Sequence, residues 1–108
     1  MAFDEGLAER VRACLGADPA IAEKRMFGGL AFLRAGNMAV GVIGDDLVVR
    51  VGPDAAAAAL ARPGARPLDL TGRPMRGWVV VDASALTAEA LAGWVDEGRA
   101  FAAALPPK

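Results

Sequence analysis

The sheet of this protein is predicted by residues 30–51, which read LAFLRAGNMAVGVIGDDLVVRV. Three apolar runs in this stretch are separated by short segments of Gly, Asn and Asp, which are residues that favour turns. Strands joined by turns of two or three residues pair as an antiparallel meander. The runs and the turn signals between them are 30–34, Gly36-Asn37, 38–43, Gly44-Asp45-Asp46 and 47–51.

The third run also predicts two unlike faces for the sheet. Side chains alternate along a strand, so Leu47, Val49 and Val51 share one face. Val48 and Arg50 share the other face, which therefore carries a charge at the end of the strand.

Helices are predicted on both sides of these strands in the chain. Asp4 is a suitable N-cap for an amphipathic helix over 4–15, and Gly16 is a suitable residue to end it. Thr87 begins a long C-terminal helix that Pro106-Pro107 stops. The remaining segments are a strand over 21–26, a short alanine-rich helix over 55–61, a loop over 71–77 and a strand over 78–82. We therefore expect an α+β fold, in which an antiparallel sheet packs with an N-terminal, a short middle and a long C-terminal helix.

The size and composition favour a single cytoplasmic domain over residues 1–108. A chain of 108 residues can form a core without metals or disulfides, and Cys14 has no second cysteine to pair with. The acidic N-terminus does not resemble a signal peptide. The net charge is −1, but residues 24–76 carry eight bases and four acids, and the two ends of the chain are acidic. The positive charge of the middle segment favours either a solvated surface or a site for an anion.

The sequence offers little for catalysis. It contains no histidine and no tyrosine, which removes the commonest general base and metal ligand. It contains no nucleotide-binding glycine loop and no nucleophile motif. We therefore expect no catalytic residues, no metal and no cofactor, and a protein that binds rather than an enzyme.

Two short segments combine bases, glycines, methionine and an aromatic residue, and they are the candidate binding site. Paired glycines in a strand region mark a tight turn or a close backbone approach, with the apolar neighbours filling the core. The functional alternative is that exposed amides and flanking cations bind an anion, which requires the two segments to meet in space. The candidate residues are Lys24, Arg25, Phe27, Gly28 and Gly29 in the first segment and Arg73, Arg76 and Trp78 in the second.

The same segments carry a resemblance to a known family. The ordered strings at residues 24–32, 36–38, 47–52 and 72–78 resemble the N-terminal domain of TfoX/Sxy proteins over nearly the whole chain. The resemblance implies a curved antiparallel sheet flanked by helices and a relation to bacterial regulators of competence and transcription. Those regulators also have a helical C-terminal domain. This chain ends at Lys108 without one, so we expect a stand-alone member of undefined biochemistry.

Three functions remain open from the sequence. The first is a regulatory interaction module that binds a protein partner or DNA. The second is a domain that binds a small anionic molecule through the bases beside Phe27 or Trp78. The third is an enzyme such as a methyltransferase, which we disfavour because no cofactor loop follows a strand. A homodimer formed through a sheet edge or a helix face is a further possibility, and no membrane association is expected.

Overall fold

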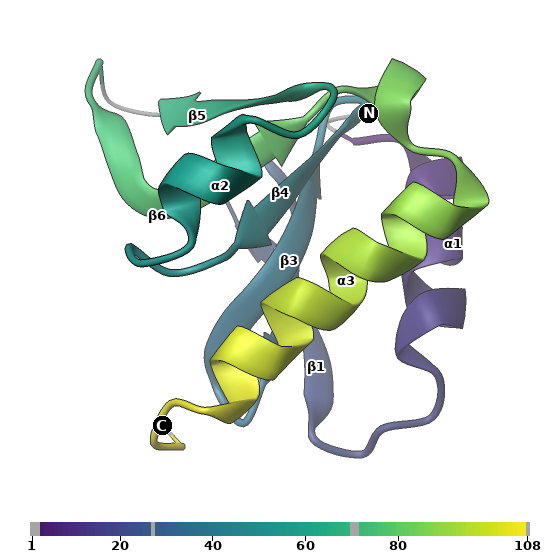
Figure 1. Ribbon diagram of the computed structural model, residues 1–108. Coiled ribbons are helices and arrows are strands. Elements are labelled where there is room, and N and C mark those ends of the chain that lie inside the picture. The colour runs from purple at the N-terminus through teal and green to yellow at the C-terminus, as the bar shows by residue number, and fades with distance from the viewer. Residues whose placement is uncertain (1–2, 27, 70–71, 108) are drawn as a thin grey trace.

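The structure is a computed structural model that describes residues 3–26, 28–69 and 72–107. Six strands form one antiparallel sheet in the order β1-β2-β3-β4-β6-β5, and three helices pack beside it (Figure 1). The fold is α+β, as the sequence predicts. The elements are α1 Glu5–Leu15, β1 Ile21–Met26, β2 Gly29–Arg34, β3 Asn37–Ile43, β4 Asp46–Arg50, α2 Ala56–Leu60, β5 Ala65–Asp69, β6 Pro74–Val81 and α3 Ala88–Ala103, with a 3₁₀ turn η1 at Ala83–Ala85.

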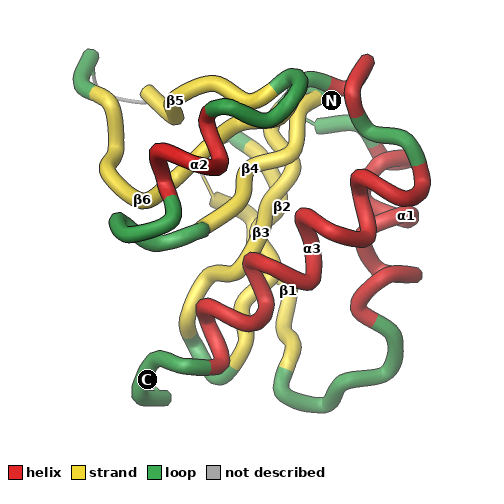
Figure 2. Tube along the Cα trace, viewed as in Figure 1, coloured by secondary structure: helices red, strands yellow, loops and turns green. Residues whose placement is uncertain are grey.

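All three helices pack on one face of the sheet. Helix α3 crosses β3 and β4 diagonally and contacts α1 beside it (Figures 1 and 2). One large core joins the inward residues of the strands to the apolar faces of the helices. The strands also form a smaller cluster that contains no helix residue, centred on Val48, Leu68 and Val80. Since side chains alternate along a strand, this cluster lies on the face opposite the helices, which we call the open face.

Three of the predicted helix ends are confirmed, whereas α3 ends at Ala103, before the prolines expected to stop it. The Asp4 side chain accepts hydrogen bonds from the backbone N–H groups of Gly6 and Leu7 at the start of α1. Gly16 ends this helix with a positive φ of 67°. The Thr87 hydroxyl accepts a hydrogen bond from the Ala90 N–H at the start of α3. The sequence places these boundaries correctly because capping depends on residues adjacent in the chain.

The turn between β2 and β3 lies one residue earlier than predicted. Ala35 and Gly36 form it, and both have positive φ angles, 51° and 85°. This is the backbone geometry of a type I′ hairpin turn, which matches the twist of the flanking strands. Asn37 is instead the first residue of β3, where it is buried and its Nδ2 donates a hydrogen bond to the Pro106 carbonyl.

The predicted loop over 71–77 is too long, because β6 already begins at Pro74, and the strand β5 over Ala65–Asp69 was not predicted. Each of these two strands contains a proline, a residue that argues against a strand when only the sequence is considered. Pro67 lies in β5, which is an edge strand, and Pro74 is the first residue of β6. Both are positions where a strand tolerates a residue without an N–H group. The register between β5 and β6 also shifts between Pro67 and Asp69, which disturbs the alternation that marks a strand.

None of the helices in the described part of the chain is long and apolar enough to cross a membrane.

Candidate binding site

A cavity of about 260 Å³ lies on the open face of the sheet. We call it the methionine cavity, because Met26, Met38 and Met75 all line it. These are three of the four methionines in the chain. The lining residues come from β1, β2, β3, β4, β5, β6 and the β2–β3 turn, and they are Met26, Leu33, Gly36, Met38, Ile43, Val48, Arg50, Leu68, Met75 and Trp78.

The cavity exists because the sheet is curved. Met26 in β1 and Met75 in β6 are separated by three intervening strands. Neighbouring strands lie ~4.8 Å apart, so a flat sheet would separate β1 and β6 by roughly 19 Å. Residues of both strands nevertheless line one small cavity, so the open face is concave. The curved sheet that the family resemblance implies is therefore present.

Two irregularities in β3 place Met38 in the cavity. The register between β2 and β3 shifts so that Phe32 pairs with Val40 whereas Leu33 pairs with Met38. The extra residue on β3 is Ala39, and such a bulge bends a strand and redirects its side chains. Gly41 then leaves the space that the Met38 side chain occupies, because a Cβ at residue 41 would lie 2.7 Å from the Met38 Cε.

Trp78 is positioned by a kink in β6. Gly77 has a φ of 88°, a conformation that favours glycine, and its carbonyl accepts hydrogen bonds from the N–H groups of Val51 and Gly52, both at 2.9 Å. The kink ties β6 to the end of β4, where Trp78 pairs with Arg50.

Arg50 is the only charged residue among the described residues that line the cavity. Its guanidinium carbon lies 5.2 Å from the centre of the Trp78 ring and 5.5 Å from the centre of the Phe101 ring. Both distances are within the range of a cation–π interaction. No carboxylate in the described part of the chain forms an ion pair with Arg50. The aromatic rings thus position a cation whose N–H groups are not occupied by an acid.

The two segments predicted as a binding site meet at this cavity, but through their apolar residues. Met26 comes from the first segment, and Met75 and Trp78 come from the second. Of the eight candidate residues, only Trp78 is among the lining residues that the structure describes. The position of Phe27 lies outside the described residues.

The four candidate bases are exposed, and none of them is among the residues that line the cavity. Lys24 pairs with Ala31 across β1 and β2, and Arg25 lies 5.5 Å from the centre of the Phe3 ring, at the edge of the main core. Arg73 precedes β6 and Arg76 lies within it. Whether any of them contacts a ligand stays a prediction.

Gly28 and Gly29 have a structural role that agrees with the first alternative drawn from the sequence. Gly28 has a φ of 74° in the turn before β2. A Cβ at Gly29 would lie 2.2 Å from the Val42 carbonyl oxygen, so β2 and β3 approach too closely there for a side chain. These two glycines are therefore required for the turn and for strand pairing, whatever else they do.

Sequence reasoning did not select Met38 or Arg50 for the site. Arg50 had a usable signal, because it is a base on the open face of an otherwise apolar strand. Met38 had none, since a methionine in a strand usually fills a core.

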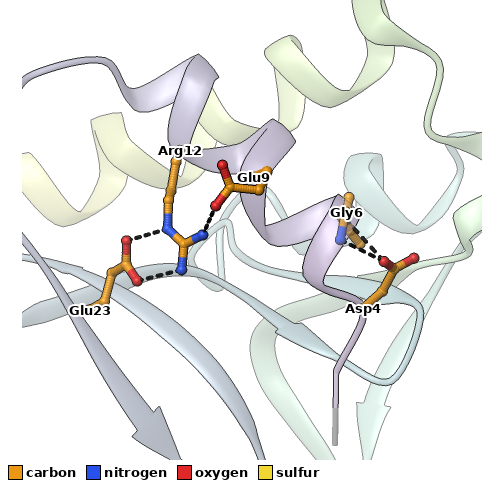
Figure 3. A network of polar contacts seen from close by, with 6 residues as sticks. Asp4, Gly6, Glu9, Arg12 and Glu23 are labelled. Atoms are coloured by element: carbon orange, nitrogen blue, oxygen red, sulfur yellow. Dashed lines mark hydrogen bonds and ion pairs between the residues drawn. The ribbon is translucent and has the colours of Figure 1, made fainter. Parts of the chain in front are cut away.

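A network of ion pairs around Arg12 lies away from this cavity. Arg12 of α1 donates two hydrogen bonds to Glu23 of β1, at 2.6 and 2.8 Å, and another to Glu9 (Figure 3). The hydrogen bond from Arg12, together with its charge, lowers the pKa of Glu23 despite partial burial. The same contacts raise the pKa of Arg12. This network fastens α1 to β1 on the helix face, so its role is structural.

Comparison with known proteins agrees with this architecture. A family model described as the TfoX N-terminal domain matches residues 13–102, a range that contains every residue lining the methionine cavity. Searches of curated proteins and of solved structures found no match to the chain. Because the family model covers well over half of its length, the chain belongs to the TfoX N-terminal domain family.

Proposed function

We propose that this protein is a non-catalytic, cytoplasmic interaction module that binds a protein partner through the open face of its sheet. Its role would be regulatory, in keeping with the competence and transcription regulators that the family name suggests. The observation that carries the proposal is the convergence of the two segments on one cavity. Met26 and Met75 lie far apart in the sequence, yet both line the same concave surface.

The chemistry of the cavity suits an apolar side chain of a partner. Methionine is flexible and polarizable, and it is common at surfaces that adapt to their partners. Met26, Met38 and Met75 are each partly exposed, and so is Trp78. Aromatic residues and methionine are enriched in the buried centres of protein interfaces.

The lining residues suit binding better than catalysis. Among those described, Arg50 alone has an ionisable side chain, and arginine stays protonated at all ordinary pH values. The rest of the lining is apolar and has no group that could exchange a proton with a substrate. This supports a site that holds a group without transforming it.

A protein partner is better supported than DNA by the distribution of bases. Three of the eight bases in residues 24–76 are already paired with acids: Arg34 with Asp18, Arg62 with Glu97, and Arg66 with Asp46 and Asp82. Arg25 lies beside Phe3 at the main core, whereas Arg50 lines the methionine cavity. DNA binding favours a continuous stripe of free bases on one face.

The test is an affinity capture with three immobilised proteins. They are the wild type, Met75→Glu, which puts a charge into the cavity, and Arg66→Gln, which removes an exposed base on β5 outside it. We expect a protein to be retained by the wild type and by Arg66→Gln but not by Met75→Glu. The retained protein is then purified and its direct binding is measured by calorimetry.

Two outcomes would contradict the proposal. One is a set of captured proteins that does not depend on residue 75. The other is binding of a short DNA duplex with a slope of log K against log salt of about −3, the value for three to four phosphate contacts. Circular dichroism of each variant shows that loss of capture does not come from unfolding.

A further inference from the structure

We propose that the methionine cavity binds a small apolar carboxylate, with the apolar group among the methionines and the carboxylate on Arg50. This goes beyond the proposed function, because it names a small molecule and does not require a protein partner.

The volume of the cavity fits such a ligand. An apolar protein cavity of ~150 Å³ is enough to hold a benzene molecule. The methionine cavity has about 260 Å³, so it has room for an aromatic ring and a short chain. Transfer of an apolar group from water into this apolar cavity is favourable.

The positive charge of Arg50 favours a ligand with an anionic group at one end. Arg50 brings one positive charge, and no acidic residue is found among the described lining residues. A guanidinium holds its N–H donors in a planar fork that matches the two oxygens of a carboxylate. The Arg50 guanidinium carbon lies within cation–π distance of the Trp78 and Phe101 rings, and no acid among the described residues pairs with its N–H groups, so these donors can serve a ligand.

The number of bases favours a single negative charge on the ligand. Lys24, Arg73 and Arg76 do not line the cavity, so a second anionic group would find no second cation among the described lining residues. A polar group buried without a partner costs free energy. A monocarboxylate therefore fits better than a dicarboxylate or a phosphate ester with further charges.

A regulatory consequence follows, and it rests on the proposed function. The carboxylate and an apolar side chain of a partner would need the same volume beside Met38 and Met75. Binding of one would therefore exclude the other, and the small molecule would release the partner.

The test uses 4-phenylbutyrate together with two analogues that carry an alcohol or an amine in place of the carboxylate. Each is titrated into the ¹⁵N-labelled protein, and amide shifts are followed by NMR. We expect saturable binding of the carboxylate, in the high-micromolar to low-millimolar range usual for a ligand of this size. The shifts should centre on the residues around Met38, Arg50 and Trp78. The alcohol should bind about tenfold more weakly and the amine not at all.

Variants separate the roles of charge and volume. Arg50→Gln should weaken 4-phenylbutyrate binding by about tenfold or more, because hydrogen bonds between charged groups are the stronger class. Arg50→Lys should restore part of the loss. Leu33→Trp fills the cavity and keeps Arg50, so it should abolish binding. Arg66→Gln removes the same charge outside the cavity and should bind as the wild type does.

Three results would overturn the inference. They are equal binding of the carboxylate, alcohol and amine, no saturation at millimolar concentration, or a larger loss with Arg73→Gln or Arg76→Gln than with Arg50→Gln. The ligand test and the partner test can fail separately. If 4-phenylbutyrate binds but no protein is captured, the ligand site is supported and the protein partner is ruled out. If a protein is captured but 4-phenylbutyrate does not bind, only the ligand site is ruled out.

Discussion

Gly98 of α3 lies directly against the backbone of Ala39 in β3, so that a Cβ at Gly98 would be 2.5 Å from the Ala39 carbonyl oxygen. Helix and sheet are therefore in backbone contact at this point. The same Ala39 is the extra residue of the bulge that directs Met38 into the cavity on the other face. Ala39 therefore takes part both in the packing of α3 on one face of β3 and in the bulge that shapes the open face.

Gly98→Ala should destabilise the fold by about 1–3 kcal/mol, the usual cost of forcing extra atoms into a packed site. Gly93→Ala in the same helix is the matched control, because the nearest atom to its Cβ would be an Arg62 nitrogen at 3.9 Å. There the better helix propensity of alanine should add about 0.5–1 kcal/mol of stability. Urea unfolding of both variants measures the difference. Equal free energies of unfolding would show that the close contact has no energetic weight.

Alanine substitutions at Gly28 and Gly29 should destabilise the fold to different extents. Gly29→Ala should be severely destabilising, since its Cβ would lie 2.2 Å from the Val42 carbonyl oxygen. Gly28→Ala meets no atom within 4 Å and should cost only the strain of its positive φ, about 1–2 kcal/mol. Thermal unfolding followed by circular dichroism compares them. A Gly29→Ala protein as stable as Gly28→Ala would remove the close-approach explanation.

Arg62 should stabilise the fold mainly through Trp94. Its guanidinium carbon lies 3.5 Å from the centre of the buried Trp94 ring, and it also forms an ion pair with Glu97 at 2.7 Å. Arg62→Ala should cost about 1–2 kcal/mol, because it removes both contacts. Glu97→Gln removes only the partly exposed ion pair and should cost about 0.2–1 kcal/mol. If chemical denaturation gives the two variants the same loss, the aromatic contact contributes nothing.

Stability should fall at acid pH through Glu23 and Asp18. The Arg12 hydrogen bond lowers the pKa of Glu23 below its ordinary 4.5, and the backbone N–H of Ala20, followed by Arg34, lowers that of Asp18 below 3.8. The folded state therefore binds these protons less readily than the unfolded chain. The carboxylates stabilise the fold above their ordinary pKa values, and this contribution is lost as pH falls through the folded-state values.

Urea midpoints measured between about pH 6 and pH 3 test this dependence. Glu23→Gln should be less stable than the wild type at the upper end of the range, and the two curves should converge at the lower end. Asp45→Asn serves as a control, because the Asp45 side chain is exposed and forms none of the ion pairs found among the described residues. A constant gap between wild type and Glu23→Gln at every pH would contradict the assignment.

Local rules account for the parts of the fold that the sequence predicts well. The caps at Asp4 and Thr87 and the strands around residues 30–51 depend on neighbours in the chain, and they are confirmed. The strand predicted over 78–82 is the second half of β6, but β5 and the start of β6 were missed, because Pro67 and Pro74 read as breaks in a strand. Only a place at the edge of the sheet makes Pro67 acceptable, and a place in a sheet is not a local property.

For the candidate site too, the sequence predicted some features and only the tertiary structure revealed the others. By itself, the sequence determined that Lys24–Gly29 and Arg73–Trp78 are unusual segments, and that Arg50 lies on the face opposite Val49. Tertiary structure alone decided that the segments meet through Met26, Met75 and Trp78 and not through their bases. The physical reason is the curvature of the sheet, which depends on bulges, close glycine contacts and helix packing together. The hydrophobic periodicity of the sequence does not reveal how these contacts combine. The cavity can therefore be recognised only in the folded structure.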